Sequence, residues 1–318
     1  MNIKFLRKKI CMVVLFLILQ NLSLLYCQES EFSLNLPKDT WKCVVLIQAE
    51  LLLNGTTVYQ PIGTGFWFGT DKCNYVITAQ HVLKKYNQQK QTFEEYLFNK
   101  IRFLYYTVGK NEETSAIISI DLKIANDVRA IYASDKKDII AVKIGRALGN
   151  GLWETPKCII LEKKGEGIIP VVKNKDCLKF EKVELTSDII FFGFPSSLKR
   201  FSEIFSLQEI QFDPELPMFR KGIIAGKNKN KKTLILDGEV HEGNSGGPVF
   251  LIEQDTPGHK KIWLIGLTTQ FIPYVSVSIN EKGLPTNINL QNAGYSVVEP
   301  IDYVIELIEK YEKEQIKK

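Results

Sequence analysis

Apolar residues occur along most of this chain in short blocks that are separated by turn-forming residues. Between residues 40 and 300 these blocks are four to six residues long, which suits strands better than helices. The clearest blocks are residues 44–47, 75–78, 101–106, 116–120, 139–144, 189–192, 233–236, 249–252 and 262–267. Repeated strands without helical patterns between them are typical of a β-sandwich or a β-barrel. The pattern therefore predicts an all-β fold for this part of the chain.

The spacing of apolar residues changes after Pro300. The apolar positions beyond it are Ile301, Val304, Ile305, Ile308 and Tyr311. Separations of three and four residues place them on one face of a helix, and Pro300 suits a first helical turn. We predict an amphipathic helix over about residues 300–315. Packing on the protein's own core is a simpler role for it than binding a partner.

The N-terminal segment has the pattern of a secretory signal peptide. Four basic residues precede an apolar stretch that runs from residue 10 to residue 19 and continues more weakly to residue 25. We predict a leader over residues 1–27 and an exported protein, either periplasmic or secreted. Residues 24–27, Leu-Leu-Tyr-Cys, also resemble a bacterial lipobox, although Tyr26 is large for its place, so a lipoprotein carrying lipid on Cys27 is an alternative. An uncleaved anchor is a third alternative, and it would be short for a membrane span.

Length and charge narrow the class of protein further. The formal charge of +5 falls to +1 without residues 1–27, which contribute four basic and no acidic residues. This balance gives no reason to expect nucleic acid or another polyanion as a partner. Residues 28–318 show no repeat and no linker, and all-β folds of this length often form one domain. We expect membrane contact only through a lipid or an N-terminal anchor; the sequence does not indicate an oligomeric state.

Four cysteines remain after the leader: Cys43, Cys73, Cys158 and Cys177. Export permits disulfides, and four cysteines allow three pairings, of which Cys158–Cys177 is the most local. Buried structural thiols, or a partly paired set, are the favoured interpretation. The spacing lacks a zinc-binding pattern, so we expect neither a metal nor another cofactor.

The strongest chemical signal is Gly-Asn-Ser-Gly-Gly-Pro at residues 243–248. Glycines beside Ser245 allow a tight turn that directs backbone N–H groups inward, as a serine nucleophile needs for its oxyanion. The alternative is an ordinary glycine-rich turn with an incidental serine. A nucleophilic serine also requires a base and an acid that orients the base.

Only three histidines are available as the base: His81, His241 and His259. His81 follows a β-type run and therefore lies at a strand end. Asp138 is the preferred acid because it opens the apolar run at residues 139–144, where a carboxylate needs a partner. The competing carboxylates lie in more polar surroundings; they are Asp121, Asp127 and Asp135.

Three of these segments resemble the active-site motifs of trypsin-like serine proteases of the chymotrypsin fold. They are Thr-Ala-Gln-His at 78–81, Asp-Ile-Ile-Ala-Val at 138–142 and the hexapeptide at 243–248. The order His, Asp, Ser fits that fold and not the α/β-hydrolases or subtilisins. Gly-Thr-Gly-Phe at 63–66 and Phe-Gly-Phe-Pro at 192–195 are lesser matches. The resemblance covers roughly residues 40–300 and is nearest to the bacterial HtrA/Deg branch, but too little chain follows Ser245 for the PDZ domain of those enzymes.

The resemblance implies a fold and a set of roles. It implies two six-stranded antiparallel β-barrels, over about residues 40–150 and 155–299, and a C-terminal helix packed on the second. Ser245 would be the nucleophile, His81 the general base and Asp138 its orienting acid, in an endopeptidase that cleaves polypeptides through an acyl-enzyme. The N–H groups of Gly243 and Ser245 would form the oxyanion hole, provided that the Gly243–Asn244 peptide is suitably oriented.

The sequence indicates the substrate specificity less clearly than it indicates the catalytic residues. Glu239 lies six residues before Ser245, where relatives that prefer a basic residue carry a carboxylate, although a solvated loop residue is the simpler interpretation. His241 falls near the pocket wall by its spacing, and Thr268 replaces the histidine of glutamate-specific relatives.

Two other classes of function compete with an active endopeptidase. A catalytically silent homologue that acts as a binding protein would keep the fold, but the three triad residues are all present here. An esterase or lipase would share the Gly-x-Ser-x-Gly pattern around Ser245, but it would place Asp and His after the serine.

Overall fold

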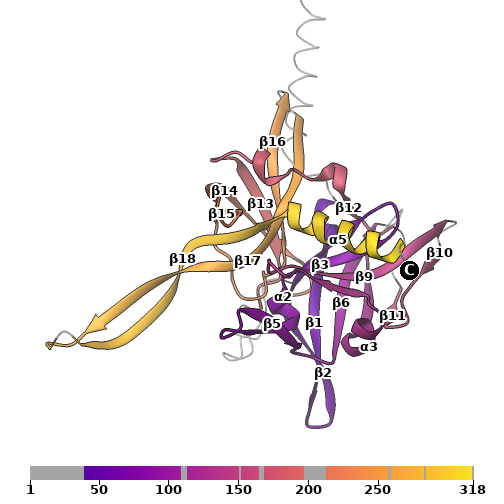
Figure 1. Cartoon of the computed structure of the whole chain (residues 1–318), viewed down its shortest axis with the longest axis horizontal. Helices are drawn as coiled ribbons and strands as arrows, with labels where there is room; N and C mark the ends of the chain where they lie inside the picture. The colour runs from indigo at the N-terminus through magenta and orange to yellow at the C-terminus, as the bar shows by residue number, and fades with distance from the viewer. Residues whose placement is uncertain are drawn as a thin grey trace, which may run out of the picture.

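The computed structural model describes residues 39–108, 113–149, 152–164, 168–196, 213–256, 259–282 and 284–316. Two large β-structures and one long C-terminal helix make up this part of the chain (Figure 1). The predicted all-β class with a C-terminal helix is therefore confirmed. Residues 1–27, where a leader is expected, lie outside the described residues. No helix within the described part of the chain is both long and apolar enough to cross a membrane.

The first β-structure is a sheet built from the N-terminal half of the chain. Its strands are β1 (Val44–Leu53), β2 (Thr56–Gly69), β3 (Asn74–Thr78), β6 (Lys100–Val108), β7 (Glu113–Asp121), β8 (Ile131–Ala133), β9 (Ile140–Gly149), β10 (Leu152–Glu154), β11 (Ile159–Lys163) and β12 (Val172–Lys173). The main path of pairing runs β10-β9-β3-β2-β1-β6-β7-β11, with β8 beside β9 and β12 beside β2. Among the described residues this path does not close, so the sheet is larger and more open than the six-stranded barrel that was expected.

The second β-structure is a closed six-stranded barrel, as the family resemblance implied. Its strands are β13 (Asp188–Gly193), β14 (Met218–Asn228), β15 (Thr233–Asp237), β16 (Pro248–Thr256), β17 (His259–Ile279) and β18 (Pro285–Pro300). They close in the order β13-β14-β15-β18-β17-β16. The boundary expected near residue 155 is too early, because β11 pairs with β7 and β12 pairs with β2 in the first sheet.

Short elements connect the strands and carry part of the site. They are η1 (Thr40–Cys43), α2 (Gln80–Leu83), the hairpin of β4 (Lys84–Asn87) and β5 (Thr92–Tyr96), α3 (Leu122–Asp127), η2 (Asn174–Asp176) and η3 (Phe180–Lys182). The four-residue α2 follows directly from β3. Its Val82 and Leu83 are buried, which fixes the turn against the first sheet.

The predicted C-terminal helix is α5 (Ile301–Ile316). Its apolar face joins a buried cluster that contains residues of both β-structures, such as Phe66 of β2 and Leu264 of β17. Glu312 accepts hydrogen bonds from Thr70 Oγ1 at 2.6 Å and from Tyr75 Oη at 3.1 Å, on the first sheet. The helix therefore ties the two halves together and does not pack on the second barrel alone.

All four cysteines of the described chain are free thiols. The most local candidate pair does not form, because Cys158 is buried in the core of the first sheet while Cys177 packs at the cluster shared with the barrel. Burial raises the pKa of the Cys43 thiol to about 12, so that thiol is held in its neutral form.

Candidate active site

His81 lies at the point where β3 turns into α2. Ala79 keeps an extended backbone before the helical turn begins at Gln80. The flanking Val82 and Leu83 point into the core, and this leaves the His81 side chain 36% exposed at the surface. The expected strand-end position of His81 is therefore found.

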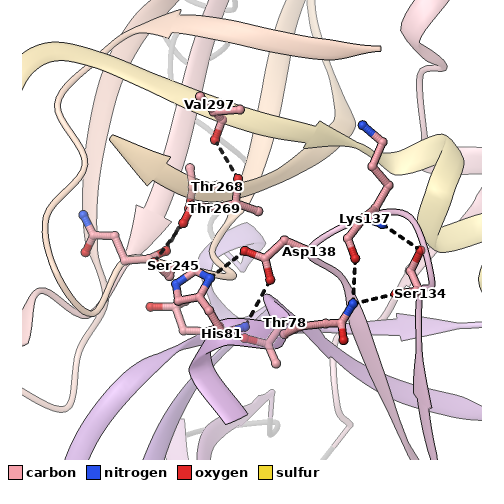
Figure 2. A network of polar contacts seen from close by, with 12 residues as sticks. Thr78, His81, Ser134, Lys137, Asp138, Ser245, Thr268, Thr269 and Val297 are labelled. Atoms are coloured by element: carbon pink, nitrogen blue, oxygen red, sulfur yellow. Dashed lines mark hydrogen bonds and ion pairs between the residues drawn. The ribbon is translucent and has the colours of Figure 1, made fainter. Parts of the chain in front are cut away.

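Asp138 holds His81 through both carboxylate oxygens, one on the imidazole and one on the backbone N–H (Figure 2). Its Oδ2 lies 2.6 Å from His81 Nδ1, and its Oδ1 accepts the His81 backbone N–H at 3.1 Å. A carboxylate at Nδ1 favours the tautomer that carries its proton on that nitrogen. His81 Nε2 is then left as a proton acceptor, which is the state that a general base requires.

A buried glutamine fixes the loop that presents Asp138. Gln80 Nε2 donates to the carbonyl oxygens of Ser134 and Lys137, each at 2.7 Å. Ser134 Oγ in turn accepts the Lys137 backbone N–H at 3.2 Å. Because Gln80 and His81 are adjacent, one helical turn positions the base and the loop of its acid together.

The competing carboxylates lie away from His81 and have other roles. Asp121 caps α3 by accepting the Ile124 N–H at 2.9 Å, and Asp127 is the last residue of that helix. The Asp135 side chain is 85% exposed and pairs loosely with Lys310 at 3.6 Å. Of the four carboxylates considered from the sequence, only Asp138 forms a hydrogen bond with His81 in the described structure.

The Ser245 loop depends on two glycines with left-handed backbone angles. Gly243 has φ +92° and Gly246 has φ +85°, which non-glycine residues rarely adopt. A Cβ on Gly243 would lie 2.2 Å from the Phe194 carbonyl oxygen, and one on Gly246 would lie 2.2 Å from the Thr64 carbonyl oxygen. The hexapeptide is thus a packed and conformationally specific loop, unlike an ordinary exposed turn.

Ser245 lies beside the His81 ring (Figure 2). Its carbonyl oxygen accepts the Thr64 N–H at 2.9 Å, and its Oγ donates to the Thr269 carbonyl oxygen at 3.3 Å. No hydrogen bond among the described residues joins the hydroxyl to the imidazole. The Ser245 hydroxyl must therefore leave the Thr269 carbonyl before Oγ donates to Nε2, and apo sites often show such loose geometry.

Two backbone N–H groups of this loop are without an acceptor in the described structure: those of Gly243 and Ser245. The carbonyl groups around them are engaged elsewhere. The Glu242 carbonyl accepts the Ser196 N–H at 2.9 Å, and the Gly243 carbonyl accepts the Thr64 hydroxyl at 2.6 Å. The Glu242–Gly243 peptide, which carries the Gly243 N–H, is therefore held by Ser196. The Gly243–Asn244 peptide, whose orientation the sequence left open, is held by Thr64.

A cavity of about 770 Å³ opens next to His81. Asp138, Thr269 and Gln270 contribute to its wall, and the separate β4–β5 hairpin, which begins at Lys84, lines another part of it. Burial lowers the pKa of Lys84. Within the described chain no three His, Cys, Asp or Glu side chains are grouped as metal ligands.

The residues considered for specificity are engaged with one another or buried. Arg220 Nη1 pairs with Glu239 Oε2 at 3.2 Å, and Arg220 Nη2 lies 2.9 Å from His241 Nε2. The Glu239 carboxylate is therefore already neutralised from β14. Thr268 is buried, and its hydroxyl donates to the Asn244 carbonyl at 2.8 Å, so it supports the nucleophile loop.

Sequence reasoning missed four residues that shape this site. Thr64 and Gln80 stand inside motifs that the sequence singled out, but nothing in one sequence assigns them hydrogen-bond partners 179 and 54 residues away. Arg220 and Thr269 lie in ordinary strand sequence and carried no local signal.

Comparison with known proteins identifies the family of this chain. The model of the trypsin-like peptidase domain family matches residues 63–256, a segment that contains His81, Asp138 and Ser245. The chain belongs to this family of trypsin-like peptidase domains. Among solved structures it is similar to the protease Anisep from Arthrobacter nicotinovorans, at 13% identity and a TM-score of 0.42, covering 81% of this chain and 90% of that one. No match was found among curated protein sequences.

Proposed function

We propose that this protein is an exported serine endopeptidase whose triad is Ser245, His81 and Asp138. The observation that carries the proposal is the 2.6 Å contact of Asp138 with His81 Nδ1, which leaves Nε2 as acceptor beside Ser245. The unengaged N–H groups of Gly243 and Ser245 support a ready oxyanion hole. Membership of the peptidase family makes polypeptides the expected substrates.

In this proposal the reaction has two steps, acylation of Ser245 and hydrolysis of the acyl-enzyme. Ser245 Oγ bonds to the scissile carbonyl carbon while its proton passes to His81 Nε2, and the carbonyl oxygen becomes an oxyanion held by the two N–H groups. The imidazolium, stabilised by Asp138, then protonates the leaving nitrogen as the C–N bond breaks, which leaves an acyl group on Ser245. A water molecule that loses its proton to His81 hydrolyses this ester and regenerates the serine.

One observation favours the alternative of a catalytically silent homologue that serves as a binding protein. The Ser245 hydroxyl is bonded to the Thr269 carbonyl and not to His81. In the endopeptidase this bond breaks when substrate arrives, whereas in a silent homologue it persists.

A phosphonate probe that reacts with activated serines separates the two functions. The purified protein should be labelled at Ser245, as read by mass spectrometry of its peptides. A Ser245→Ala variant should lose the label and hydrolyse casein at least about 10⁴-fold more slowly, while it still binds casein. An unlabelled but folded wild-type protein would favour the binding role.

Export and branch membership are parts of the same proposal. The leader pattern of residues 1–27 supports export, either free or as a lipoprotein on Cys27. The motifs at residues 63–66 and 243–248 support an origin near the HtrA/Deg branch. Mass spectrometry of the mature N-terminus tests the first point, because a free N-terminus and a lipidated Cys27 differ in mass.

A further inference from the structure

The hairpin of β17 and β18 extends well beyond the barrel as a two-stranded arm (Figure 1). β17 pairs with β16 only as far as Leu267. From Thr268 to Ile279, the described structure pairs it with β18 alone. Among the described residues the arm therefore has no third strand on either edge, and we define it as residues 273–282 and 284–292.

The arm has one apolar and one polar face. Val275 lies opposite Leu290, and Val277 lies opposite Ile288, so these four side chains share a face with Ile279. All five are exposed, from 49% at Val277 to 66% at Ile279. The other face carries the pairs Ser276 with Asn289 and Ser278 with Asn287, and at its base the exposed Tyr274 opposite Gln291. We call the first set of five residues the apolar face of the arm.

Such a pattern is unusual for a ribbon that nothing covers. Strict alternation of apolar and polar residues is typical of a strand with one buried face. A two-stranded hairpin alone is marginal in water, and contiguous exposed apolar patches mark binding sites. The sequence of the arm thus fits a ribbon whose apolar face becomes covered when the protein works.

The arm is continuous with the candidate active site. β17 runs into the arm from Thr269 and Gln270, which line the cavity beside His81. The Thr269 carbonyl oxygen accepts the hydrogen bond of the Ser245 hydroxyl. A strand rises about 3.4 Å per residue, so Gln270 to Ile279 spans roughly 30 Å away from the cleft. A polypeptide that occupies the cleft in an extended form is therefore the ligand best placed to continue along the arm.

We propose that the arm is an exosite that binds extended, apolar segments of polypeptide substrates. The proposal rests on the proposed peptidase function and names the substrate class of that site. Substrates with about ten or more flexible residues beyond the scissile bond gain contact with the apolar face. Short peptides that fill only the cleft do not.

A second copy of this chain is the competing occupant. A stable interface buries roughly 800 Å² on each partner. An aliphatic side chain offers only about 60–120 Å² when fully exposed, and the five side chains of the apolar face are between half and two-thirds exposed. The five side chains by themselves therefore fall short of the area that a stable dimer needs, but they suffice to add to the binding of a substrate that the cleft also holds.

The test compares the two faces of the arm in one protein. The variant Val277→Thr/Ile288→Thr/Leu290→Thr removes apolar surface while it keeps strand-favouring residues. The matched control, Ser276→Thr/Asn289→Thr, changes the polar face. We expect the apolar-face variant to raise KM for casein by roughly tenfold at unchanged kcat, and the control to stay within about twofold. Both should react with the serine-directed phosphonate at the wild-type rate, which shows that each has folded around an intact site.

A second readout does not depend on catalysis. In the Ser245→Ala background, binding of fluorescent casein is measured by anisotropy, with and without the apolar-face changes, and we expect about tenfold weaker binding with them. Unchanged casein binding and KM would overturn the exosite. So would light scattering that shows a wild-type dimer converted to a monomer by the same changes. A wild-type protein that binds casein through the arm but resists the phosphonate would overturn the peptidase proposal and leave the binding surface standing.

Discussion

The Thr64 hydroxyl donates a buried 2.6 Å hydrogen bond to the carbonyl oxygen of Gly243, which lies 179 residues further along the chain. The same hydroxyl oxygen accepts the Phe194 N–H at 3.0 Å, and the Thr64 N–H reaches the Ser245 carbonyl at 2.9 Å. One residue of β2 in the first sheet therefore fixes the backbone on both sides of Asn244 in the second half of the molecule. The backbone conformation of the loop that carries the Gly243 and Ser245 N–H groups depends on this contact between the halves.

Replacing Thr64 with Val should impair turnover more than substrate binding. The change keeps the shape but leaves the Gly243 carbonyl and the Phe194 N–H unsatisfied in a buried place, at a cost of about 1–3 kcal/mol. If that cost falls on the arrangement of the oxyanion hole, kcat drops roughly 5- to 100-fold. The measurement is kcat and KM on casein, with thermal unfolding in parallel. Thr64→Ser keeps the hydroxyl and should retain most activity; equal losses in the two variants would contradict the role given to this hydrogen bond.

Replacing Asp138 with Asn should nearly abolish activity in a folded protein. The amide keeps the shape but favours the wrong imidazole tautomer, and we expect a loss of about 10⁴ in kcat. Asp135→Asn is the matched control, because that side chain is 85% exposed and contributes little. Turnover should stay within about twofold of wild type in the control. A dead but folded Asp135 variant beside an active Asp138 variant would show that the acid is misassigned.

The same residues show why part of the site was predictable from sequence. His81, Asp138 and Ser245 each stand in a short local pattern: a strand end, a carboxylate opening an apolar run, a glycine-rich turn. The three patterns in this order indicate the chemistry, whereas each of them alone has an ordinary structural explanation. The strands of the second half were predictable because their blocks of apolar residues are regular, and the closed barrel was implied by the family resemblance. Thr64 and Gln80 act through partners far along the chain, and only the folded backbone brings such partners together.

The features that the sequence did not predict correctly also have physical explanations. Strand lengths and pairing partners do not follow from apolar periodicity, so β11 and β12 were assigned to the wrong half and the first sheet was expected to be smaller. The alternation at residues 275–279 and 287–290 was overlooked because it lies in polar-rich sequence that reads as loop. The pairing of Glu239 with Arg220 was not predicted, because Arg220 comes from a strand with no local signal.

Gly246→Ala should destabilise the protein through a clash as well as through backbone strain. Gly246 and Gly55 have similar backbone angles, φ +85° and φ +80°, but a Cβ on Gly55 meets nothing within 4 Å. Gly55→Ala should therefore lower the free energy of unfolding by the backbone strain alone, about 1 kcal/mol. We expect Gly246→Ala to cost at least about 2 kcal/mol more, because its Cβ must displace packed backbone. Urea unfolding of both variants measures the difference, and equal costs would mean that the loop moves aside freely.

The free energy of unfolding should fall in mildly alkaline solution because the buried Cys43 thiol resists losing its proton in the folded protein. Burial raises its pKa from 9.0 to about 12, so the unfolded chain releases this proton at a lower pH than the folded one. The stability it contributes is complete below pH about 9 and is lost as the pH rises from there towards 12, by up to about 1.4 kcal/mol per pH unit. The free energy of unfolding should therefore fall between pH 8.5 and 10, and Cys43→Ala should flatten that fall. An unchanged slope in the variant would show that the thiol does not titrate in this way.

Removing Arg220 should reveal whether Glu239 faces the substrate. In the wild type the guanidinium neutralises the carboxylate at 3.2 Å, so we expect no marked preference for a basic residue before the scissile bond. Arg220→Gln leaves the Glu239 charge unpaired, and kcat/KM for substrates with Lys or Arg at that position should rise about tenfold relative to Leu, equivalent to about 1.4 kcal/mol. Lys221→Gln is the control, since it removes the same charge from the next residue, whose partner is Asp188 at 3.0 Å. A peptide library that varies only the residue before the scissile bond gives both ratios. If Arg220→Gln and Lys221→Gln behave alike, Glu239 lies outside the pocket, and its pairing with Arg220 is a surface contact without influence on specificity.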